Sequence, residues 1–292
     1  NNFKFTIAVT KGTVYYIGVR QYSGYAISGD YALTITVTAY DDGAKPQGDG
    51  TSANPYQITN AAQLAWFRNW VNGTYTPDED ETATSHADAC AKLTADIDMA
   101  PVCSGSVGSW IPISSQSKNV NWSGTFDGGG HTISGLDLSG NLSPAGLFGV
   151  LQEGAVVRDL RVSGTVQPTG GSRDVGGIAG RSGGLIENCA FSGTVSGKDG
   201  VGGIVGTNAL TGTIRSCTAA GSVTGSSRTG GITGVNLGVV SSCRNDSYVN
   251  ITSVDPGINL SDLDLTPSAQ LLTLRSLDTV NVATDTGGIA GY

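Results

Sequence analysis

The apolar residues of this chain recur with a period in the twenties. The phrase Val-Gly-Gly-Ile-Ala-Gly stands at 175–180, and close copies follow at 201–206, 229–234 and 286–291, with a worn copy at 145–149. Measured at the second glycine of each copy, the steps are 31, 26, 28 and 57 residues, and the last is twice 28.5. A fixed period of this size predicts a solenoid, in which each repeat is one coil that buries its apolar side by stacking on its neighbours.

Alignment of the copies predicts rows of side chains that point into the coil. The rows are Leu160, Cys189, Cys217 and Cys243; Val162, Phe191, Ala219 and Asn245; Val166, Val195, Val223 and Val249; and Val157, Ile186, Ile214 and Val240. Equivalent residues of successive coils stack ~4.8 Å apart in a parallel β-structure, so each row becomes a ladder along the axis. These ladders are the predicted core.

Small polar residues between two inward rows predict a corner of the coil. They are Asp159, Asn188, Ser216 and Ser242, and such side chains bond the nearby backbone and tolerate unusual dihedral angles. The doubled glycine follows a similar logic, because a tight bend needs either a positive φ or a close approach of the backbone. Asn208 and Asn236 predict another bend.

The repeats are preceded by segments of a different kind. Alternating residues at 3–9, 13–20 and 30–38 predict three strands, and 41–53 is a polar Gly/Pro-rich linker. The aspartates of the linker fit solvated positions better than a calcium site, because the EF-hand spacing is absent. A capping-box pattern, Asn60-Ala-Ala-Gln63, predicts a helix over 60–72 that covers the open end of the first coil.

The repeat is interrupted between 254 and 282. Residues 267–277 read as a short helix, and the doubled step holds either one ordinary coil plus an excursion or one coil without its glycines. Such an insertion either carries binding residues or is a side decoration or partial cap.

The first part of the chain resembles a known family. The segments 11–20 and 29–37 are similar to the last strands of the bacterial pre-peptidase C-terminal domain family. This resemblance implies that residues 1–40 form part of a small antiparallel β-sandwich of the kind attached to secreted enzymes and surface proteins.

A second resemblance covers residues 54–292. Lys92–Asp98, Trp110–Ile113 and Trp122–Leu136, followed by Gly-Leu-Phe-Gly and the Gly-Gly-Ile copies, look like the bacterial GLUG-motif repeat region. The family implies a right-handed parallel β-helix in secreted or cell-wall proteins, including adhesin-like proteins and non-catalytic parts of secreted proteases. The expected fold is therefore all-β, a right-handed parallel β-helix with an N-terminal capping helix, preceded by the partial antiparallel β-sandwich.

Composition narrows the possible partners. The net charge is −8 with only 16 Lys and Arg, which argues against nucleic acid as a partner, because phosphate contacts need clustered cations. No apolar run approaches the ~20 residues of a membrane-spanning helix. With 44 glycines in 292 residues, the chain is rich in turns.

The five cysteines fall into two groups. Those of the ladder are expected to be buried free thiols, because Cβ atoms ~4.8 Å apart exceed the ~3.8 Å of a disulfide. Cys90 and Cys103 flank a short loop and form a possible disulfide, which would contribute roughly 3 kcal/mol in an exported protein. No Cys-x-x-Cys pair or His cluster indicates zinc, and no cofactor is expected.

Four residues are candidates for catalysis: Asp96, Asp98, Asp127 and His131. Glycosidase-type chemistry needs two carboxylates ~5 to 9.5 Å apart on one outward face. The outward rows Arg161, Ala190, Thr218, Arg244 and Ser163, Ser192, Ala220, Asp246 contain no carboxylate pair on adjacent coils. Asp127 and His131 fit a turn better, Asp96 and Asp98 fit strand ends, and two histidines do not support a Ser-His-Asp triad.

These observations predict a non-catalytic, extracellular structural or adhesin-like module of a bacterial secreted or cell-surface protein. The chain reads as a fragment, so its expected partners are other domains of a longer chain, and its unfinished ends could join copies into a filament. The alternatives are a polysaccharide lyase or glycosidase, or a module that binds a surface glycan without turnover. For glycan binding, Trp110 and Trp122 could serve as platforms or could pack in the core.

Overall fold

The computed structural model describes residues 45–74, 86–103, 108–116, 120, 122–250 and 284–290. The chain divides into two compact units, Asn1–Ala39 and Tyr40–Tyr292, and all described residues belong to the second. The predicted sandwich at 1–40 and the interruption at 254–282 lie outside the described residues.

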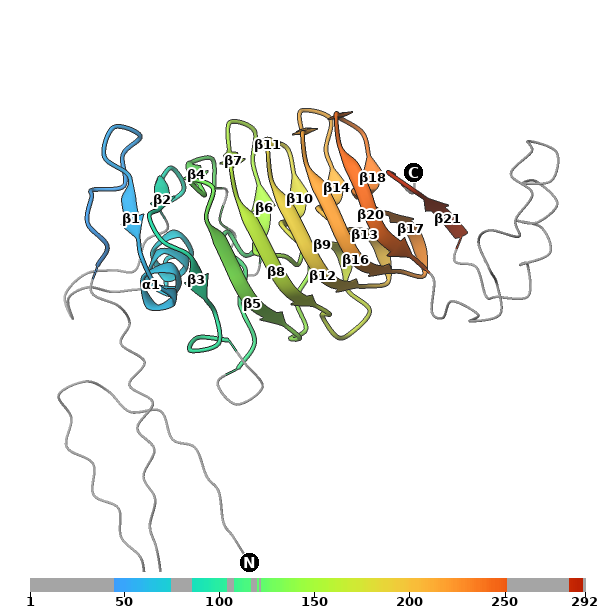
Figure 1. Cartoon of the computed structure of the whole chain (residues 1–292), viewed down its shortest axis with the longest axis horizontal. Coiled ribbons are helices and arrows are strands. Elements are labelled where there is room, and N and C mark those ends of the chain that lie inside the picture. Colours follow the sequence, from blue (N-terminus) through green and yellow to red (C-terminus); the bar gives the residue numbers. More distant parts are fainter. Residues whose placement is uncertain are drawn as a thin grey trace, which may run out of the picture. The chain divides into compact units, whose positions relative to one another are not determined.

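Four sheets form the walls of a solenoid (Figure 1). In spatial order, sheet 1 consists of β1 (Tyr56–Ile58), β2 (Ala91–Leu93), β4 (Thr125–Asp127), β7 (Val156–Arg158), β11 (Leu185–Glu187), β15 (Thr213–Arg215) and β19 (Val239–Ser241). Sheet 2 consists of β3 (Ile97–Asp98), β5 (Thr132–Leu138), β8 (Arg161–Val166), β12 (Ala190–Ser196), β16 (Thr218–Thr224) and β20 (Arg244–Val249).

The other two sheets have four strands each. Sheet 3 consists of β6 (Phe148–Leu151), β10 (Ala179–Ser182), β14 (Val205–Asn208) and β18 (Thr233–Asn236). Sheet 4 consists of β9 (Arg173–Gly176), β13 (Asp199–Gly202), β17 (Ser227–Gly230) and β21 (Thr284–Gly287). A coil visits sheets 4, 3, 1 and 2 in turn, as β9 to β12 do, and neighbouring strands within the sheets are parallel. The predicted parallel β-solenoid is confirmed.

The register of the strands stacks the predicted inward rows. In sheet 2, Phe191 pairs with Val162 and Ala219, and Val195 pairs with Val166 and Val223. The Ile186 row of sheet 1 is likewise in register. The members of these rows are buried up to the last coil of the described part, where Asn245, Val249 and Val240 are only partly buried. The rows are therefore continuous apolar columns, as the period predicts.

The doubled glycines are required by close packing. A Cβ atom on Gly177 would lie 2.2 Å from the Phe191 ring, and one on Gly203 would lie 2.3 Å from the Gly231 carbonyl oxygen. Neither glycine has a positive φ. Of the two reasons that the sequence offers for these glycines, the close approach is the one that applies.

The helix α1 (Ala61–Val71) packs against the first coils (Figure 1). Asn60 is its N-cap and accepts a hydrogen bond from Gln63 N, as the capping box predicts, while Asn72 is the C-cap. Phe67 is fully buried, with its ring 6.0 Å from that of Phe126 in β4. The Asn72 amide also bonds Pro112 O and Ser115 N, which fixes the helix end to the following coil.

The pairing of β21 explains the doubled step of the repeat. β21 is the direct neighbour of β17, and Ala290 bridges Thr233 of β18. No strand of sheet 4 therefore lies between these two copies in the described part of the chain. Residues 251–283, which connect β20 to β21, lie outside the described part of the chain, so the two alternatives for them stay predictions.

Candidate functional site

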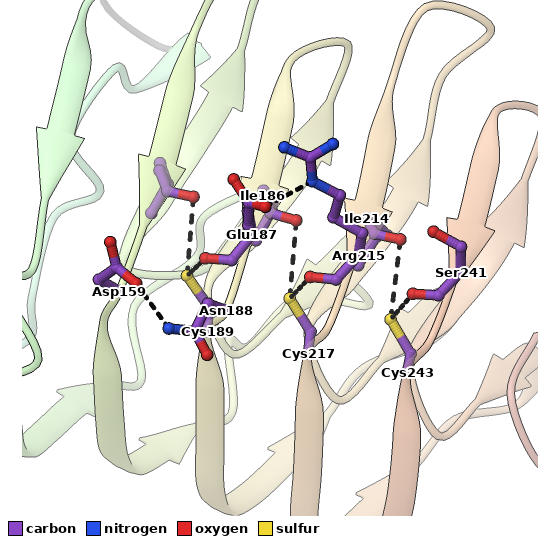
Figure 2. Close-up of polar contacts among 11 residues, drawn as sticks. Asp159, Ile186, Glu187, Asn188, Cys189, Ile214, Arg215, Cys217, Ser241 and Cys243 are labelled. Atoms are coloured by element: carbon purple, nitrogen blue, oxygen red, sulfur yellow. Dashed lines mark hydrogen bonds and ion pairs between the residues drawn. The ribbon is translucent and has the colours of Figure 1, made fainter.

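The corner between sheets 1 and 2 contains the small polar residues that the sequence singles out, of which Figure 2 shows Asp159 and Asn188. The corner residues Asp159, Asn188, Ser216 and Ser242 have φ angles of 52°, 51°, 53° and 53°. This is the left-handed region, which Asn, Asp and Ser tolerate better than bulky residues do. The predicted corner is confirmed, and its dihedral angle repeats on each coil.

The residue after each corner position points inward and stacks along the axis. Ala190 N donates to Leu160 O, Thr218 N to Cys189 O, and Arg244 N to Cys217 O, at 2.8, 3.0 and 2.9 Å. Leu160, Cys189, Cys217 and Cys243 thus occupy one position on successive coils. Cys189 and Cys217 are buried and Cys243 is partly buried, and all three are free thiols.

Each ladder thiol lies against two main-chain carbonyl groups (Figure 2). The Sγ–O distances are 3.2 Å to Glu187 and 3.7 Å to Val157 for Cys189, 3.2 Å to Arg215 and 3.6 Å to Ile186 for Cys217, and 3.3 Å to Ser241 and 3.7 Å to Ile214 for Cys243. A thiol has one hydrogen, so it donates to one carbonyl at a time.

The surroundings of Cys217 and Cys243 keep these two thiols protonated. Contact with the Cys189 thiol, together with burial, raises the pKa of Cys217 to about 12, and contact with Cys217 and burial also raise the pKa of Cys243. Since the thiolate is the nucleophile and the metal ligand, these positions are suited to packing and not to reactivity. Within the described residues, no group of three His, Cys, Asp or Glu side chains could hold a metal ion.

Cys90 and Cys103 lie in different surroundings. Cys90 Sγ accepts a hydrogen bond from Thr125 N of sheet 1 at 3.4 Å, and Cys103 Sγ accepts one from Asp137 N of sheet 2 at 3.4 Å. Both are buried free thiols in the structure, and burial raises the pKa of Cys103. A disulfide between them stays a prediction.

Charged side chains alternate along the outer side of sheet 1. Their positions are in register on β2, β4, β7, β11 and β15 and carry Lys92, Asp127, Arg158, Glu187 and Arg215. We call this row the charge ladder. Sequence reasoning missed it, although the residues directly before the predicted corner alternate in sign.

Two ion pairs form within the charge ladder. Arg158 Nη2 lies 2.9 Å from Asp127 Oδ2, and Arg215 Nε lies 2.6 Å from Glu187 Oε1. The hydrogen bond from Arg215 lowers the pKa of Glu187. Burial acts to raise the pKa of Asp127, but the Gly129 N–H and the Arg158 guanidinium outweigh it and lower that pKa. These carboxylates are held as anions by their neighbours.

The structure brings two of the four catalytic candidates together. His131 Nδ1 lies 3.2 Å from Asp96 Oδ1, which also accepts a hydrogen bond from Thr132 N at 2.9 Å. The bond from Thr132 N is the main cause that lowers the pKa of Asp96, whose side chain is 75% exposed. Asp127 instead contacts Arg158, and Asp98 accepts from Ala100 N at 3.0 Å. Asp96 and Asp98 therefore bond main-chain N–H groups at strand ends, as the sequence suggests.

Beside the His131 turn, the corner contains a hollow of about 220 Å³, which we call the corner groove. Its lining consists of Gly130, Asp159, Arg161, Asn188, Cys189, Ala190, Ser216 and Thr218. The strand register places Arg161, Ala190 and Thr218 side by side on β8, β12 and β16. The sequence predicts this outward row and the corner, but not the hollow between them.

The two tryptophans considered as glycan platforms are in the core. Trp110 and Trp122 are fully buried, and their indole N–H groups donate to Leu147 O and Ala89 O at 3.1 and 2.8 Å. The platform interpretation is therefore wrong, and core packing is correct, because a fully buried indole has no face open to a glycan.

No helix in the described part of the chain is both long and apolar enough to cross a membrane.

Comparison with known proteins supports the repeat assignment. Residues 171–196 match the family model described as the GLUG motif. Halomucin of Haloquadratum walsbyi is 33% identical over 168 residues, which are 56% of this chain and 2% of halomucin. A protein of Evansella cellulosilytica described as a Gly-rich membrane protein is 30% identical over 162 residues, 54% of this chain and 17% of that protein. The chain thus spans a small part of these relatives.

A solved structure from Bacteroides ovatus, described as a proposed immunoglobulin A1 protease, superposes with a TM-score of 0.46. It is 21% identical, and the match covers 73% of this chain and 83% of that one. The resemblance to the GLUG repeat is confirmed by the motif match, while the pre-peptidase resemblance of residues 1–40 stays a prediction.

Proposed function

We propose that this chain is a non-catalytic structural module of a secreted or cell-surface protein, which spaces or displays other domains of a longer chain. The observation that carries the proposal is the in-register stacking of parallel coils. Each coil adds ~4.8 Å along the axis, and its core rows leave the outward residues free to vary. Such a structure is built for length and stiffness.

The relatives support this role. The matched regions are 2% of halomucin and 17% of the Gly-rich membrane protein, so in both proteins a segment of this kind is one part of a much longer chain. We extend the location that these names imply, a cell surface or the extracellular space, to this chain.

The contacts of the candidate carboxylates also favour a structural role. Asp127 pairs with Arg158, Asp98 binds a main-chain N–H, and Asp96 holds the His131 turn. Two carboxylates that act on one glycosidic bond must instead face a common substrate. We therefore expect no turnover.

Labelling of intact cells tests the location. Antibodies raised against this chain are expected to label unpermeabilised cells of the source organism or to detect the protein in the medium. Labelling that appears only after permeabilisation would contradict the proposal. An antibody against an intracellular protein of the same cells controls for leakage.

The adjacency of Asp96 and His131 is the one observation that favours an enzyme, a polysaccharide lyase or glycosidase. Incubation with neutral and uronate-containing glycans, followed by reducing-end and unsaturated-uronate assays, is expected to show no products. Turnover that disappears in Asp96→Ala or Asp127→Ala would replace the structural proposal with the enzymatic one.

Filament assembly is a finer form of the proposal. Light scattering over a wide concentration range tests it: a mass that rises with concentration supports self-association, and a constant monomer mass contradicts it. An adhesive role is the other finer form, and it requires an outward site for a ligand.

A further inference from the structure

The corner groove holds polar groups with unused hydrogen-bonding capacity. Within the described residues, the hydroxyl groups of Ser216 and Thr218 have no protein partner, although both residues line the hollow. Asn188 Nδ2 donates a hydrogen bond to Asp159 Oδ1 at 2.5 Å, which leaves the side-chain oxygen Oδ1 of Asn188 available to accept one from a ligand. Arg161 Nη1 donates a hydrogen bond to Gly130 O, and the other guanidinium N–H groups remain available to a ligand.

The charge of the lining favours a neutral ligand. Asp159 and Arg161 are its only charged residues, and their charges cancel. The net charge of −8 further disfavours a polyanion. The lining contains no aromatic side chain and no apolar one larger than alanine except the buried Cys189, so an apolar ligand would gain little from it.

The dimensions favour a chain of ring-shaped units. A hollow of about 220 Å³ is smaller than the usual drug-sized pocket and suits one small polar ring. The polar side chains come from successive coils, so they repeat every ~4.8 Å along the axis. That spacing is close to the length of one pyranose unit in an extended oligosaccharide, and neighbouring units would meet equivalent positions of neighbouring coils.

We propose that the corner groove binds a neutral, hydroxyl-rich oligosaccharide that lies along the solenoid axis, with one pyranose ring in the hollow between Arg161, Asn188 and Thr218. Hydroxyl groups both donate and accept, and they match the mixed donors and acceptors left free there. The proposal goes beyond the structural role and does not depend on it, because binding is measured on the purified chain.

Titration of the full chain tests the proposal. The probes are neutral oligosaccharides of six units from the cello-, chito-, manno- and malto-series. Oligogalacturonate and an extended uncharged peptide represent other classes of ligand. Binding is measured by changes in NMR chemical shifts or by calorimetry. We expect at least one neutral series to bind. Thr218→Val, which keeps the shape and removes the hydroxyl, and Arg161→Met are each expected to weaken binding by about tenfold.

Thr194→Val is the matched control, because Thr194 lies further along β12, beyond the Ser192 row, and does not line the groove. It is expected to bind as the unchanged chain does, and thermal unfolding of all three variants checks that they are folded. Absence of binding by every neutral series up to millimolar concentration would overturn the proposal. So would binding that Thr218→Val and Arg161→Met leave unchanged, or binding of the oligogalacturonate or the peptide alone.

Discussion

At the residue scale, side-chain amides stack where the chain turns from sheet 3 to sheet 1. Asn208 is fully buried and donates from Nδ2 to Asn236 Oδ1 of the next coil at 2.8 Å. Its own Oδ1 is buried and has no hydrogen-bond partner in the described part of the chain. The equivalent residue on the preceding coil is Ser182, whose hydroxyl donates to Gly184 O and not to Asn208 Oδ1. A buried acceptor without a partner destabilises the fold.

We expect Ser182→Asn to stabilise the chain by about 1 kcal/mol, because a new Nδ2 would donate to Asn208 Oδ1 as Asn208 donates to Asn236. The turn after Ser182 has the same length as the turn after Asn236, three residues to the next paired position in sheet 1, so the new side chain fits the local geometry. The urea midpoint of unfolding measures the effect. Ser182→Ala is the control, and a midpoint no higher than that of the unchanged chain would contradict the expectation.

One buried carboxylate makes the stability of the fold depend on pH. Asp199 in β13 is 8% exposed and contacts Arg228 and Ser227 of the next coil. The hydrogen bond from Arg228 is the main cause that lowers the pKa of Asp199 from 3.8 to about 2. A lowered carboxylate pKa stabilises the folded state above the unfolded pKa, and this stabilisation is lost as the pH falls from about 4 to 2.

We therefore expect Asp199→Asn to lower the free energy of unfolding by about 1–2 kcal/mol at pH 6 and to have little effect at pH 2. Urea unfolding at both pH values measures this difference. An equal loss at pH 6 and pH 2 would show that the carboxylate charge is not the cause.

At the scale of the elements, close packing between sheets decides where glycine is required. In three of the copies the second glycine faces the inward row of sheet 2: Gly177 against Phe191, Gly203 against Ala219 and Gly231 against Asn245. Each of these glycines also lies against the main chain of the next coil. The short contact that an added Cβ atom would make there could not be relieved by moving a side chain. The periodic phrase predicts that glycine is needed, while the contact partner is visible only in the structure.

Gly203→Ala is expected to destabilise the chain by about 2–3 kcal/mol, because its Cβ would lie 2.3 Å from Gly231 O and 2.6 Å from Ala219 Cβ. Gly183→Ala is the matched control, since the atom nearest to its Cβ is the movable Thr211 hydroxyl at 3.1 Å. Thermal unfolding compares the two. Similar melting temperatures for both variants would contradict the packing argument.

At the scale of the whole solenoid, the coil continues past an interruption. β20 ends at Val249, and β21 begins at Thr284 and pairs directly with β17. In the preceding coil only Gly225 and Ser226 connect the equivalent strands, β16 and β17. A connection of two residues is therefore long enough to join these strands, whereas more than thirty residues separate β20 from β21 in the sequence.

Deletion of residues 252–282 leaves Asn250, Ile251 and Ala283 between β20 and β21. The register of β16 and β20 puts Asn250 in the place of Thr224, the last residue of β16, so Ile251 and Ala283 correspond to Gly225 and Ser226 and the connection has its ordinary length. We expect the shortened chain to keep its β-sheet circular dichroism and its melting temperature within a few degrees, because no pairing between described strands is removed. Loss of the cooperative transition would show that the coil depends on the deleted segment. A deletion of equal length within β12 to β16 is the control, and it is expected to abolish folding.

The sequence by itself determined the solenoid, its period, the inward rows, the corner and the need for glycine. These features depend on local dihedral preferences and on the chemical identity of each repeated position, for example Asn188 at a positive φ and Ile186 in the core. Repetition then fixes the register, because each coil must bury the same positions as its neighbour.

Only the tertiary structure decided which outward residues meet across coils. The charge ladder, the Asp96–His131 contact and the corner groove each join residues about thirty positions apart, from different coils. The period shows which positions are neighbours, but a hollow depends on the sizes and directions of several side chains at once. The burial of Trp110 and Trp122 was likewise decided by the tertiary structure. The early coils depart from the regular repeat, so the period does not show which of their side chains point inward.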